Sequence, residues 1–299
     1  MRELSLIIAT YNRASWVVQT LESVVAQSTA PERWECVVVN NNSTDETVCV
    51  VERFIEEHPE FEIRLVTETK QGLSHARNCG IESSSAEVIA IIDDDEVINE
   101  EFIEAYIHLF ARHPEVASAG GKIIPRYRSS RPRWMSKYTE RPIANPIDLG
   151  EGEQPFPNGM IPGGGNMAIR RSALGRYGVF DPNLGRRGEL LIGGEENDLF
   201  QRLAQGGELC WYCPRAVMFH IIPDEKLTRE YLDRLSYNIG VSQRIRAQIE
   251  GRGYIMPEVV KWCATVAIAC GYILCGELSK ARYLWRMRRM ITKGLLRRG

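Results

Sequence analysis

The sequence predicts an α/β fold, in which a doubly wound, mostly parallel sheet is followed by a helical C-terminal extension. Apolar, β-branched runs alternate with segments of helical period, and this order builds strand–helix–strand units with parallel strands. The runs are residues 4–9, 34–39, 61–66 and 88–92. The last run is apolar throughout, as strands buried on both faces are. With 299 residues, 44% of them hydrophobic, the chain can bury one large core and carry an appendage.

Charge and cysteine content narrow the classes of function. A net charge of -2 argues against a general nucleic-acid binder. The eight cysteines are scattered, and Cys210 and Cys213 form a single CxxC pair without a second one. We therefore expect reduced, buried thiols rather than a zinc or redox site. The N-terminus leads directly into a strand without a signal sequence, which predicts a cytoplasmic location.

The first two predicted strands lead into polar loops. Residues 10–13 follow the first strand and precede a helix whose apolar face carries Val17 and Leu21. The second strand ends at Asn40. Residues 43–46 (Ser-Thr-Asp-Glu) then form a capping-box pattern, which predicts that the next helix begins there.

Four consecutive acids, Asp93, Asp94, Asp95 and Glu96, follow the strand at residues 88–92. Their charges repel one another and cannot be buried without compensation. Ligands of open α/β sheets bind beyond the carboxyl ends of the strands, and carboxylates together with phosphates suit Mg²⁺ or Mn²⁺. We therefore expect a divalent cation and a phosphate at these acids. The alternative is a solvated acidic turn.

A nucleotide is the expected ligand of this rim. Right-handed crossovers bring the loops at residues 10–13, 40–42 and 93–96 together. The sequence has neither a GxGxxG after the first strand nor a GxxxxGK[ST] loop. The phosphates would then be bound by the metal and by basic side chains such as Lys70 or Arg77. Taken alone, either residue could be an ordinary surface charge.

The middle of the chain is less regular. Residues 116–124 predict a further strand, and residues 209–219 predict closing strands that end at His220. Between them, residues 125–162 form a long irregular stretch, which is typical of a functional or mobile loop. We interpret it as a lid on the acceptor side. A disordered insertion is the alternative.

Four segments together resemble the family 2 glycosyltransferases. They are residues 9–13 (Ala-Thr-Tyr-Asn-Arg), 39–45 (Val-Asn-Asn-Asn-Ser-Thr-Asp), 72–78 (Gly-Leu-Ser-His-Ala-Arg-Asn) and 92–95 (Ile-Asp-Asp-Asp). Each segment alone is a weak motif, but the order and spacing of all four are specific to the family. The resemblance covers residues 4–223 and implies a GT-A (Rossmann-like) fold. The domains it implies are a catalytic domain at 1–224, with a nucleotide-sugar half (1–124) and an acceptor half (125–224), and a helical extension at 225–299.

The resemblance implies a nucleotide site at the rim. Thr10 and Tyr11 match residues that line the nucleobase pocket, and Asn40 matches a position, often aspartate, that bonds the uracil ring. Because an asparagine side chain both accepts and donates, uridine is the expected base, while thymidine and guanosine stay open. Arg77 matches a basic residue near the nucleotide, and Asp93 matches the acid that faces the ribose. Neighbouring loop residues are expected to line the same site: Asn12, Arg13, Asn42 and Asp94.

The resemblance also implies a metal and a donor-sugar loop. Asp95 matches the metal ligand of the DxD motif, with Mn²⁺ or Mg²⁺ as the cofactor. A histidine at the place of His220 ligates the cation in some metal-dependent relatives, whereas a lone histidine is otherwise a packed or surface residue. Three glycines before an asparagine let the backbone approach a ligand closely, and this run resembles the family's loop beside the donor sugar. A plain β-turn is the alternative. The contact residues expected there are Gly164, Gly165 and Asn166.

Residues 195–198 (Glu-Glu-Asn-Asp) begin a predicted helix, and acids at a helix N-terminus suit the helix dipole without any further role. The segment resembles the family's Glu-Asp motif, whose second acid is the catalytic base. Glu196 holds that place. Glu195 and Asp198 are three apart and share a helix face, so they are expected to fix the loop or bond the acceptor.

The C-terminal segment differs in kind from the rest. Residues 227–249 predict a helix, and residues 263–275 are apolar but too short to span a bilayer. Residues 280–298 interleave basic and apolar side chains, as amphipathic helices on anionic membranes do. A helix packed on the catalytic domain, with its basic face in solvent, is the alternative.

These observations predict a metal-dependent, inverting glycosyltransferase. A UDP-sugar is the expected donor, and a hydroxyl of a saccharide or lipid-linked saccharide is the expected acceptor, in cell-surface or extracellular polysaccharide or glycan biosynthesis. Inversion is implied by the resemblance alone. The expected location is the cytoplasm, with a peripheral position on the inner face of the cell membrane.

Three rival functions are weighed against this prediction. A sugar-nucleotide pyrophosphorylase normally carries a glycine-rich basic loop near its first strand, and residues 10–13 contain no glycine. A processive membrane polymerase is disfavoured because we find no transmembrane run and no QxxRW stretch. The non-enzyme alternative is an inactive nucleotide-sugar-binding or membrane-scaffold protein. The presence of both Asp95 and Glu196 argues against it.

Overall fold

The computed structural model describes residues 2–186, 193–249, 251 and 253–297. They form two compact units, which are described separately. Among the described residues, unit 1 comprises 2–124, 147–186 and 195–221, and unit 2 comprises 125–146, 193–194, 222–249, 251 and 253–297.

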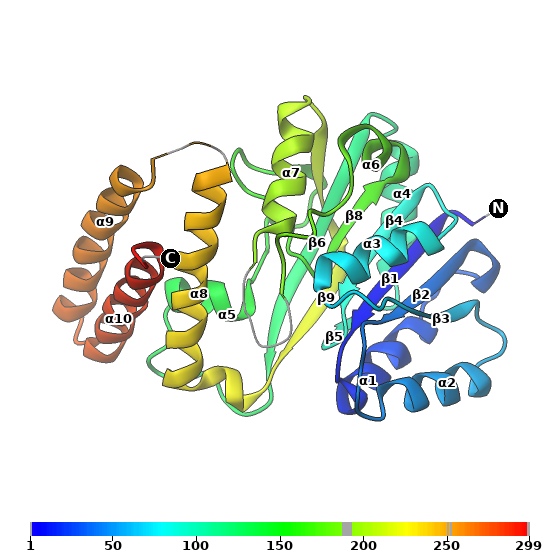
Figure 1. Cartoon of the computed structure of the whole chain (residues 1–299), viewed down its shortest axis with the longest axis horizontal. Coiled ribbons are helices and arrows are strands. Elements are labelled where there is room, and N and C mark those ends of the chain that lie inside the picture. Colours follow the sequence, from blue (N-terminus) through cyan, green and yellow to red (C-terminus); the bar gives the residue numbers. More distant parts are fainter. Residues whose placement is uncertain (1, 187–192, 250, 252, 298–299) are drawn as a thin grey trace. The chain divides into compact units, whose positions relative to one another are not determined.

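The described strands form one nine-stranded sheet. They are β1 (Leu4–Thr10), β2 (Trp34–Asn40), β3 (Ile63–Thr67), β4 (Val88–Asp93), β5 (Glu96–Ile98), β6 (Val116–Tyr127), β7 (Gln154–Pro155), β8 (Met167–Arg170) and β9 (Leu209–Ile222). The order is β3-β2-β1-β4-β8-β6-β9-β5, with β7 paired to β9 (Figure 1). β1 pairs in parallel with β2 and β4, and β2 with β3, whereas β8 joins β4 and β5 joins β9 antiparallel. The predicted α/β fold is confirmed.

Helices cover both faces of the sheet in unit 1. They are α1 (Ala14–Val25), α2 (Thr47–Glu57), α3 (Leu73–Ser83), α4 (Phe102–Arg112), α6 (Arg171–Tyr177) and α7 (Glu195–Gln205), with the 3₁₀ turn η1 (Pro31–Arg33). β1 and β2 are buried along their whole length, so successive side chains enter two different cores. One core contains Leu6 with Leu21 of α1 and Tyr106 of α4. The other contains Ile7 with Ala76 of α3.

Two local predictions need correction. The second helix begins at Thr47, not within residues 43–46, because the Asp45 carboxylate accepts the Thr47 N–H at 3.0 Å in place of a capping box. Residues 125–162 are more ordered than predicted. β6 continues to Tyr127, and helix α5 (Lys137–Ala144) has a capping box in which the Ser136 hydroxyl accepts the Thr139 N–H.

Unit 2 is a helical assembly around a core of its own. Besides α5 it holds η2 (Asp224–Leu227), α8 (Arg229–Ile249), α9 (Ile255–Leu274) and α10 (Leu278–Leu295). α8 and α10 approach so closely that a Cβ on Gly294 would collide with the backbone of Tyr237. The apolar face of α10 is buried here through Leu284, Met287 and Ile291. The amphipathic tail is therefore a packed helix, whose apolar face is not available to a membrane. Arg298 lies outside the described residues.

The apolar stretch before α10 is longer than predicted. α9 contains 20 residues, because helical periodicity continues upstream of Cys263 to Ile255. By length and composition it could cross a membrane. The prediction that this stretch is too short to span a bilayer is thus wrong. The lack of a transmembrane run therefore no longer counts against a processive membrane polymerase, and the lack of a QxxRW stretch remains.

Candidate functional site

The strand register brings the three predicted loops to one rim of unit 1. Thr10 of β1 lies opposite Asn40 of β2, and Ala9 lies opposite Asp93 of β4. The parallel strands end at the same level, so the polar residues after them share one edge of the sheet. Tyr11 is exposed at this rim, whereas Thr10 is buried.

Asn12 and Asn42 stabilise two of the loops through side-chain hydrogen bonds to the backbone. Asn12 has a φ of 53°, and its side-chain oxygen accepts the Thr44 N–H at 2.7 Å. Asn42 has a φ of 62° and donates to the Thr69 carbonyl at 2.6 Å. Asparagine adopts this left-handed conformation more readily than most residues. Asn12 and Asn42 therefore lie at the predicted rim, with side chains that hold its loops.

Asn40 and Asn41 are also held within the protein. The Asn40 oxygen, which was expected to bond the uracil ring, accepts the Ser43 N–H at 2.9 Å. Asn41 is buried and donates to the Glu68 and Lys70 carbonyls at 3.0 and 2.8 Å. The sequence analysis did not single out Asn41. A run of three asparagines is nevertheless a signal, because asparagine side chains in turns often form hydrogen bonds with the backbone. Lys70 itself is exposed.

The acidic segment lies at the end of β4. Asp94 and Asp95 are buried, and the Arg13 guanidinium lies 3.6 Å from an Asp94 oxygen. Burial, together with the charge of Asp95, raises the pKa of Asp94 to about 7. The Glu96 carboxylate accepts the Asp93 N–H at 2.9 Å, which bends the chain from β4 into β5. The segment thus combines four neighbouring acids with two guanidinium groups, those of Arg13 and Arg77.

The two predicted metal ligands, Asp95 and His220, come from segments that meet where β5 pairs with β9. Glu96 lies opposite His220, and the Ile221 N–H approaches the Asp95 carbonyl at 3.4 Å. The role of Asp95 and His220 as ligands stays a prediction. In the part of the chain that the structure describes, no three His, Cys, Asp or Glu residues form a metal-binding group. A cation here would complete its shell with phosphate or water, as Mg²⁺ commonly does.

Arg77 of α3 is the centre of the site. Its side chain is 1% exposed, and one terminal nitrogen donates to Glu195 at 3.2 Å and Glu196 at 3.0 Å. The other terminal nitrogen donates to Asp93 and to the Gly164 carbonyl, both at 3.1 Å. Burial opposes the charge, but the three carboxylates raise the pKa of Arg77. The predicted nucleotide neighbour thus binds acids from two separate segments.

Glu195 and Glu196, at the start of α7, have opposite pKa shifts. Burial and the charge of Glu196 raise the pKa of Glu195 to about 8. Burial would also raise the pKa of Glu196, but the charge and hydrogen bonds of Arg77 hold it below its usual value. One Glu195 oxygen is buried with no hydrogen-bond partner among the described residues. At neutral pH the pair is therefore one neutral acid beside one carboxylate.

Asp198 points to a different partner from Glu195. It forms an i,i+4 ion pair with Arg202 at 2.8 Å, and Arg202 also donates to the Val179 carbonyl at 2.8 Å. Asp198 therefore fixes α7 to the segment after α6, which agrees with one of its two predicted roles.

The glycine-rich loop packs against both groups of acids. A Cβ on Gly164 would collide with the Glu196 carboxylate, and one on Gly165 would collide with the Glu96 carboxylate. Asn166 is fully buried and donates to the Ala216 carbonyl at 2.9 Å. Its side chain therefore bonds the backbone of strand β9. The predicted loop residues thus divide into two glycines at the site and one asparagine behind it.

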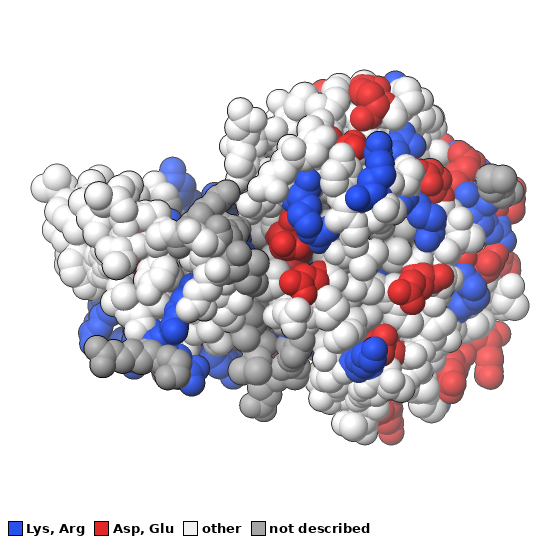
Figure 2. All heavy atoms as spheres, turned by 45° about the horizontal axis from the view of Figure 1, so that its top comes forward, with Lys and Arg blue, Asp and Glu red and all other residues white. Residues whose placement is uncertain are grey.

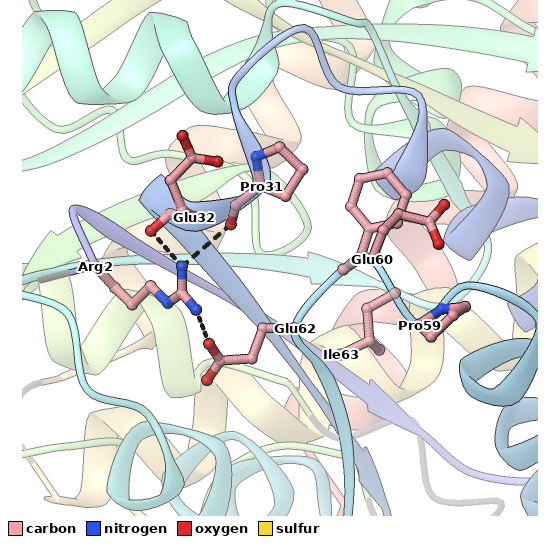
Figure 3. Close-up of a pocket in the computed structure, with 8 residues that line it drawn as sticks. Arg2, Pro31, Glu32, Pro59, Glu60, Glu62 and Ile63 are labelled. Atoms are coloured by element: carbon pink, nitrogen blue, oxygen red, sulfur yellow. Dashed lines mark hydrogen bonds and ion pairs between the residues drawn. The ribbon is translucent and has the colours of Figure 1, made fainter.

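A separate pocket lies at the other end of the parallel strands. It has a volume of about 580 Å³ and is lined by residues that include Arg2, Glu32, Glu62 and Ile63 (Figure 3). Arg2 is already paired with Glu62 and with two carbonyls of η1. The pocket lies at the amino ends of β1, β2 and β3, whereas the predicted site lies at their carboxyl ends. It contains none of the predicted site residues.

Comparison with solved structures identifies the fold. A mannosyltransferase from Pyrobaculum calidifontis, solved with GDP-Man and Mn²⁺, aligns with a TM-score of 0.62 and 20% identity over 99% of this chain and 88% of that chain. Staphylococcus aureus TarS (residues 1–349), solved with UDP-GlcNAc, gives 0.55 and 16% over 79% of this chain and 66% of that one. The fold is the GT-A fold of glycosyltransferases.

Sequence comparison gives the family. Residues 5–178 match Glycosyl transferase family 2, and the chain belongs to this family. Similar proteins include the glucosyl-dolichyl phosphate glucuronosyltransferase of Haloferax volcanii, 25% identical over 81% of this chain and 77% of that protein. Succinoglycan biosynthesis protein ExoM of Rhizobium meliloti is 25% identical over 88% of this chain and 83% of its own length. The predicted resemblance is confirmed, and the protein is a glycosyltransferase.

Proposed function

We propose that this glycosyltransferase is metal-dependent and inverting, and that it transfers a sugar from a nucleotide-diphosphate donor to a hydroxyl group. One observation carries the proposal: a single buried guanidinium, that of Arg77, bonds both Asp93 and Glu196. Asp93 belongs to the predicted donor segment and Glu196 is the predicted base. Arg77 thus holds a donor-side acid and a base at one place in the fold, as a direct displacement requires.

The donor side would be completed by Mn²⁺ or Mg²⁺ beside Asp95, with His220 as a further candidate ligand. Bound there, the cation would neutralise charge on the leaving diphosphate. Asp94 supports this assignment, because burial holds its pKa at about 7 and a cation would favour its ionised form. Thr10, Tyr11 and Asn40 are proposed to contact the nucleobase, and Asp93 the ribose.

The acceptor side would use Glu196 as the general base. The Arg77 guanidinium lowers the pKa of Glu196 and so favours its ionised form, the form that can receive the proton of an attacking hydroxyl. Arg77 orients it, and Glu195, uncharged at neutral pH, adds no second charge. Attack on the anomeric carbon from the side opposite the leaving diphosphate gives inversion.

Relatives guide the choice of substrates. One relative is named for a glucosyl-dolichyl phosphate acceptor and another for succinoglycan biosynthesis, which supports a lipid-linked saccharide acceptor and a role in glycan or polysaccharide synthesis. One solved neighbour binds UDP-GlcNAc, and another binds GDP-Man together with Mn²⁺. We therefore keep uridine as the proposed base of the donor, with guanosine as the first alternative. We retain the catalytic domain at residues 1–224 and a cytoplasmic location as proposals.

The test is calorimetry of UDP binding with and without Mn²⁺. The Asp95→Ala variant should lose the Mn²⁺-dependent part of the affinity and keep its fold, because Asp95 lies in a loop beyond β4. Asp148→Ala, at an exposed acid outside the site, is the matched control and should bind as wild type does. Asp93→Ala should weaken UDP binding even without metal.

Unchanged UDP–Mn²⁺ affinity in Asp95→Ala would overturn the metal assignment. Hydrolysis of UDP-sugars without acceptor separates the remaining candidates. A transferase hydrolyses its donor slowly to the free sugar, whereas an inactive binding protein leaves it intact. A pyrophosphorylase would instead release sugar 1-phosphate when given pyrophosphate.

A further inference from the structure

Within unit 2, helix α9 turns its hydrogen-bonded polar side chains toward α10. Glu258 is buried, accepts the Thr292 hydroxyl of α10 at 2.6 Å and lies 3.4 Å from Arg288. The Trp262 indole N–H donates to the same Thr292 hydroxyl at 2.9 Å. Thr265, one turn further along, is buried as well. The side of α9 that faces the protein thus carries these polar groups, beside the buried Ala269 and the partly buried Ile268.

The outward side of α9 is apolar. Val259, Val266 and Ile273 follow one another at two-turn intervals and are 49%, 42% and 51% exposed. Leu274 at the end of the helix is 88% exposed. A helix in water places these residues inward, so the pattern indicates that this side of α9 faces an apolar medium.

Neither a buried core helix nor a signal sequence accounts for α9. The core helix of a water-soluble domain is mostly buried, whereas only 17% of the apolar window of α9 is buried. A signal sequence lies near the N-terminus, whereas α9 begins at Ile255. Twenty residues of helix extend about 30 Å, which is the thickness of the hydrocarbon layer of a bilayer.

Basic residues on α10, the helix that packs on α9, indicate the kind of membrane. Residues 255–297 contain eight basic and two acidic residues. On α10, Arg282, Arg289 and Lys293 are exposed and lie on one side of the helix. In Figure 2, the surface at the left of the view is mostly uncharged, with Lys and Arg atoms along its lower edge. Such a layout complements a hydrocarbon layer bordered by phosphates.

We propose that the outward face of α9 is embedded in an anionic phospholipid bilayer, with the exposed basic residues of α10 at the lipid phosphates. The membrane contact is made by α9, and α10 with its buried apolar face supplies the charge. This proposal is independent of the donor chemistry in unit 1. Either one can fail while the other holds.

The test is flotation of the full chain with vesicles of phosphatidylcholine containing phosphatidylglycerol. Wild type should float with these vesicles. The triple variant Val259→Asp, Val266→Asp, Ile273→Asp should remain unbound, because three carboxylates would have to enter hydrocarbon. Leu209→Asp, at an exposed apolar residue of unit 1, is the matched control and should float. Circular dichroism and thermal unfolding verify that the triple variant is folded.

A second variant tests the charge. Arg289→Gln with Lys293→Gln changes two exposed basic residues and no apolar one. It should weaken binding to the anionic vesicles at low salt by about fivefold for each residue. Wild type that stays unbound, or a folded triple variant that floats as wild type does, would overturn the proposal. So would a wild-type dimer that becomes monomeric in the triple variant without vesicle binding, because a second copy would then cover α9. Equal binding of the Gln variant would refute the role of α10.

Discussion

The two acidic segments of the site differ in what balances their charge. Residues 93–96, after β4, have the Arg13 guanidinium 3.6 Å from Asp94, and Arg77 bonds the first of the four acids. Residues 195–198, at the start of α7, have Arg77 on both glutamates and Arg202 on Asp198. The first segment is the one at which we propose a cation. The second is already balanced by the protein.

The difference shows that a run of acidic residues in a sequence does not by itself define the chemical role of those residues. In both segments burial raises the pKa of one acid, Asp94 in the first and Glu195 in the second. The buried guanidinium of Arg77 bonds one acid of the first segment, Asp93, and both glutamates of the second. We propose proton transfer at the second segment, where Arg77 favours the ionised form of Glu196, and metal binding at the first.

The largest effect expected in the second segment is on turnover. Glu196→Gln keeps the size of the side chain and cannot accept a proton, so turnover should fall by about 10²–10⁴-fold. Donor affinity should stay near that of wild type. Steady-state kinetics with a UDP-sugar and its acceptor, together with calorimetry of UDP, measures both.

Asp198→Asn is the matched control, because this acid bonds Arg202 and lies outside the proposed chemistry. It should retain most of the turnover. If Glu196→Gln remains active while Glu195→Gln does not, the base is Glu195 and the assignment is shifted by one residue.

Removal of Arg77 should leave the second segment without its buried guanidinium. Arg77→Met leaves the buried Glu195, the partly buried Glu196 and Asp93 without their cation, and breaking a buried ion pair costs about 3–5 kcal/mol of unfolding free energy. Adding Glu196→Gln should recover part of that loss, since the ionised acid of the pair then no longer needs compensation. Urea unfolding of the two single variants and the double variant measures the coupling.

Arg64→Met is the comparison for Arg77. Arg64 also pairs with a buried acid, Glu35, but its own side chain is 46% exposed, so the loss should be smaller. Equal losses in Arg64→Met and Arg77→Met would show that Arg77 has no special place in the stability of the site.

The smallest expected effect is on the pH dependence of stability. The folded-state pKa of Glu195 is about 8, well above its ordinary value of 4.5. Between these values the unfolded chain has released the proton and the folded protein has kept it, so this group lowers stability as pH rises. Glu195→Gln should therefore flatten the decline in Tm between about pH 5 and pH 8. An unchanged slope would mean that Glu195 is already ionised at neutral pH.

Much of unit 1 could be predicted from the sequence because its signals are local. The run at residues 88–92 identified a buried strand, and the acids after it identified the rim. The position of Arg77 was not readable in the same way. Its bond to Glu195 joins residues 118 positions apart, and only tertiary packing brings them together.

The C-terminal segment shows the limit of pattern analysis. The amphipathic pattern of residues 280–298 favoured a free membrane-binding face, but that face packs on α8. α9 was judged too short because the apolar count began at Cys263, and the helix begins at Ile255. Periodicity tells which residues share a face, and packing decides which face is covered.

The two glycines of the 163–166 loop lack side chains where two carboxylates need space. Gly164 lies against Glu196, and Gly165 lies against Glu96. A methyl group at the first position would displace the proposed base, while one at the second would disturb the metal side. If the proposed roles hold, substitutions at two adjacent positions would affect proton transfer and donor binding separately. Neither glycine has a functional group of its own, so each position matters only through the space it leaves.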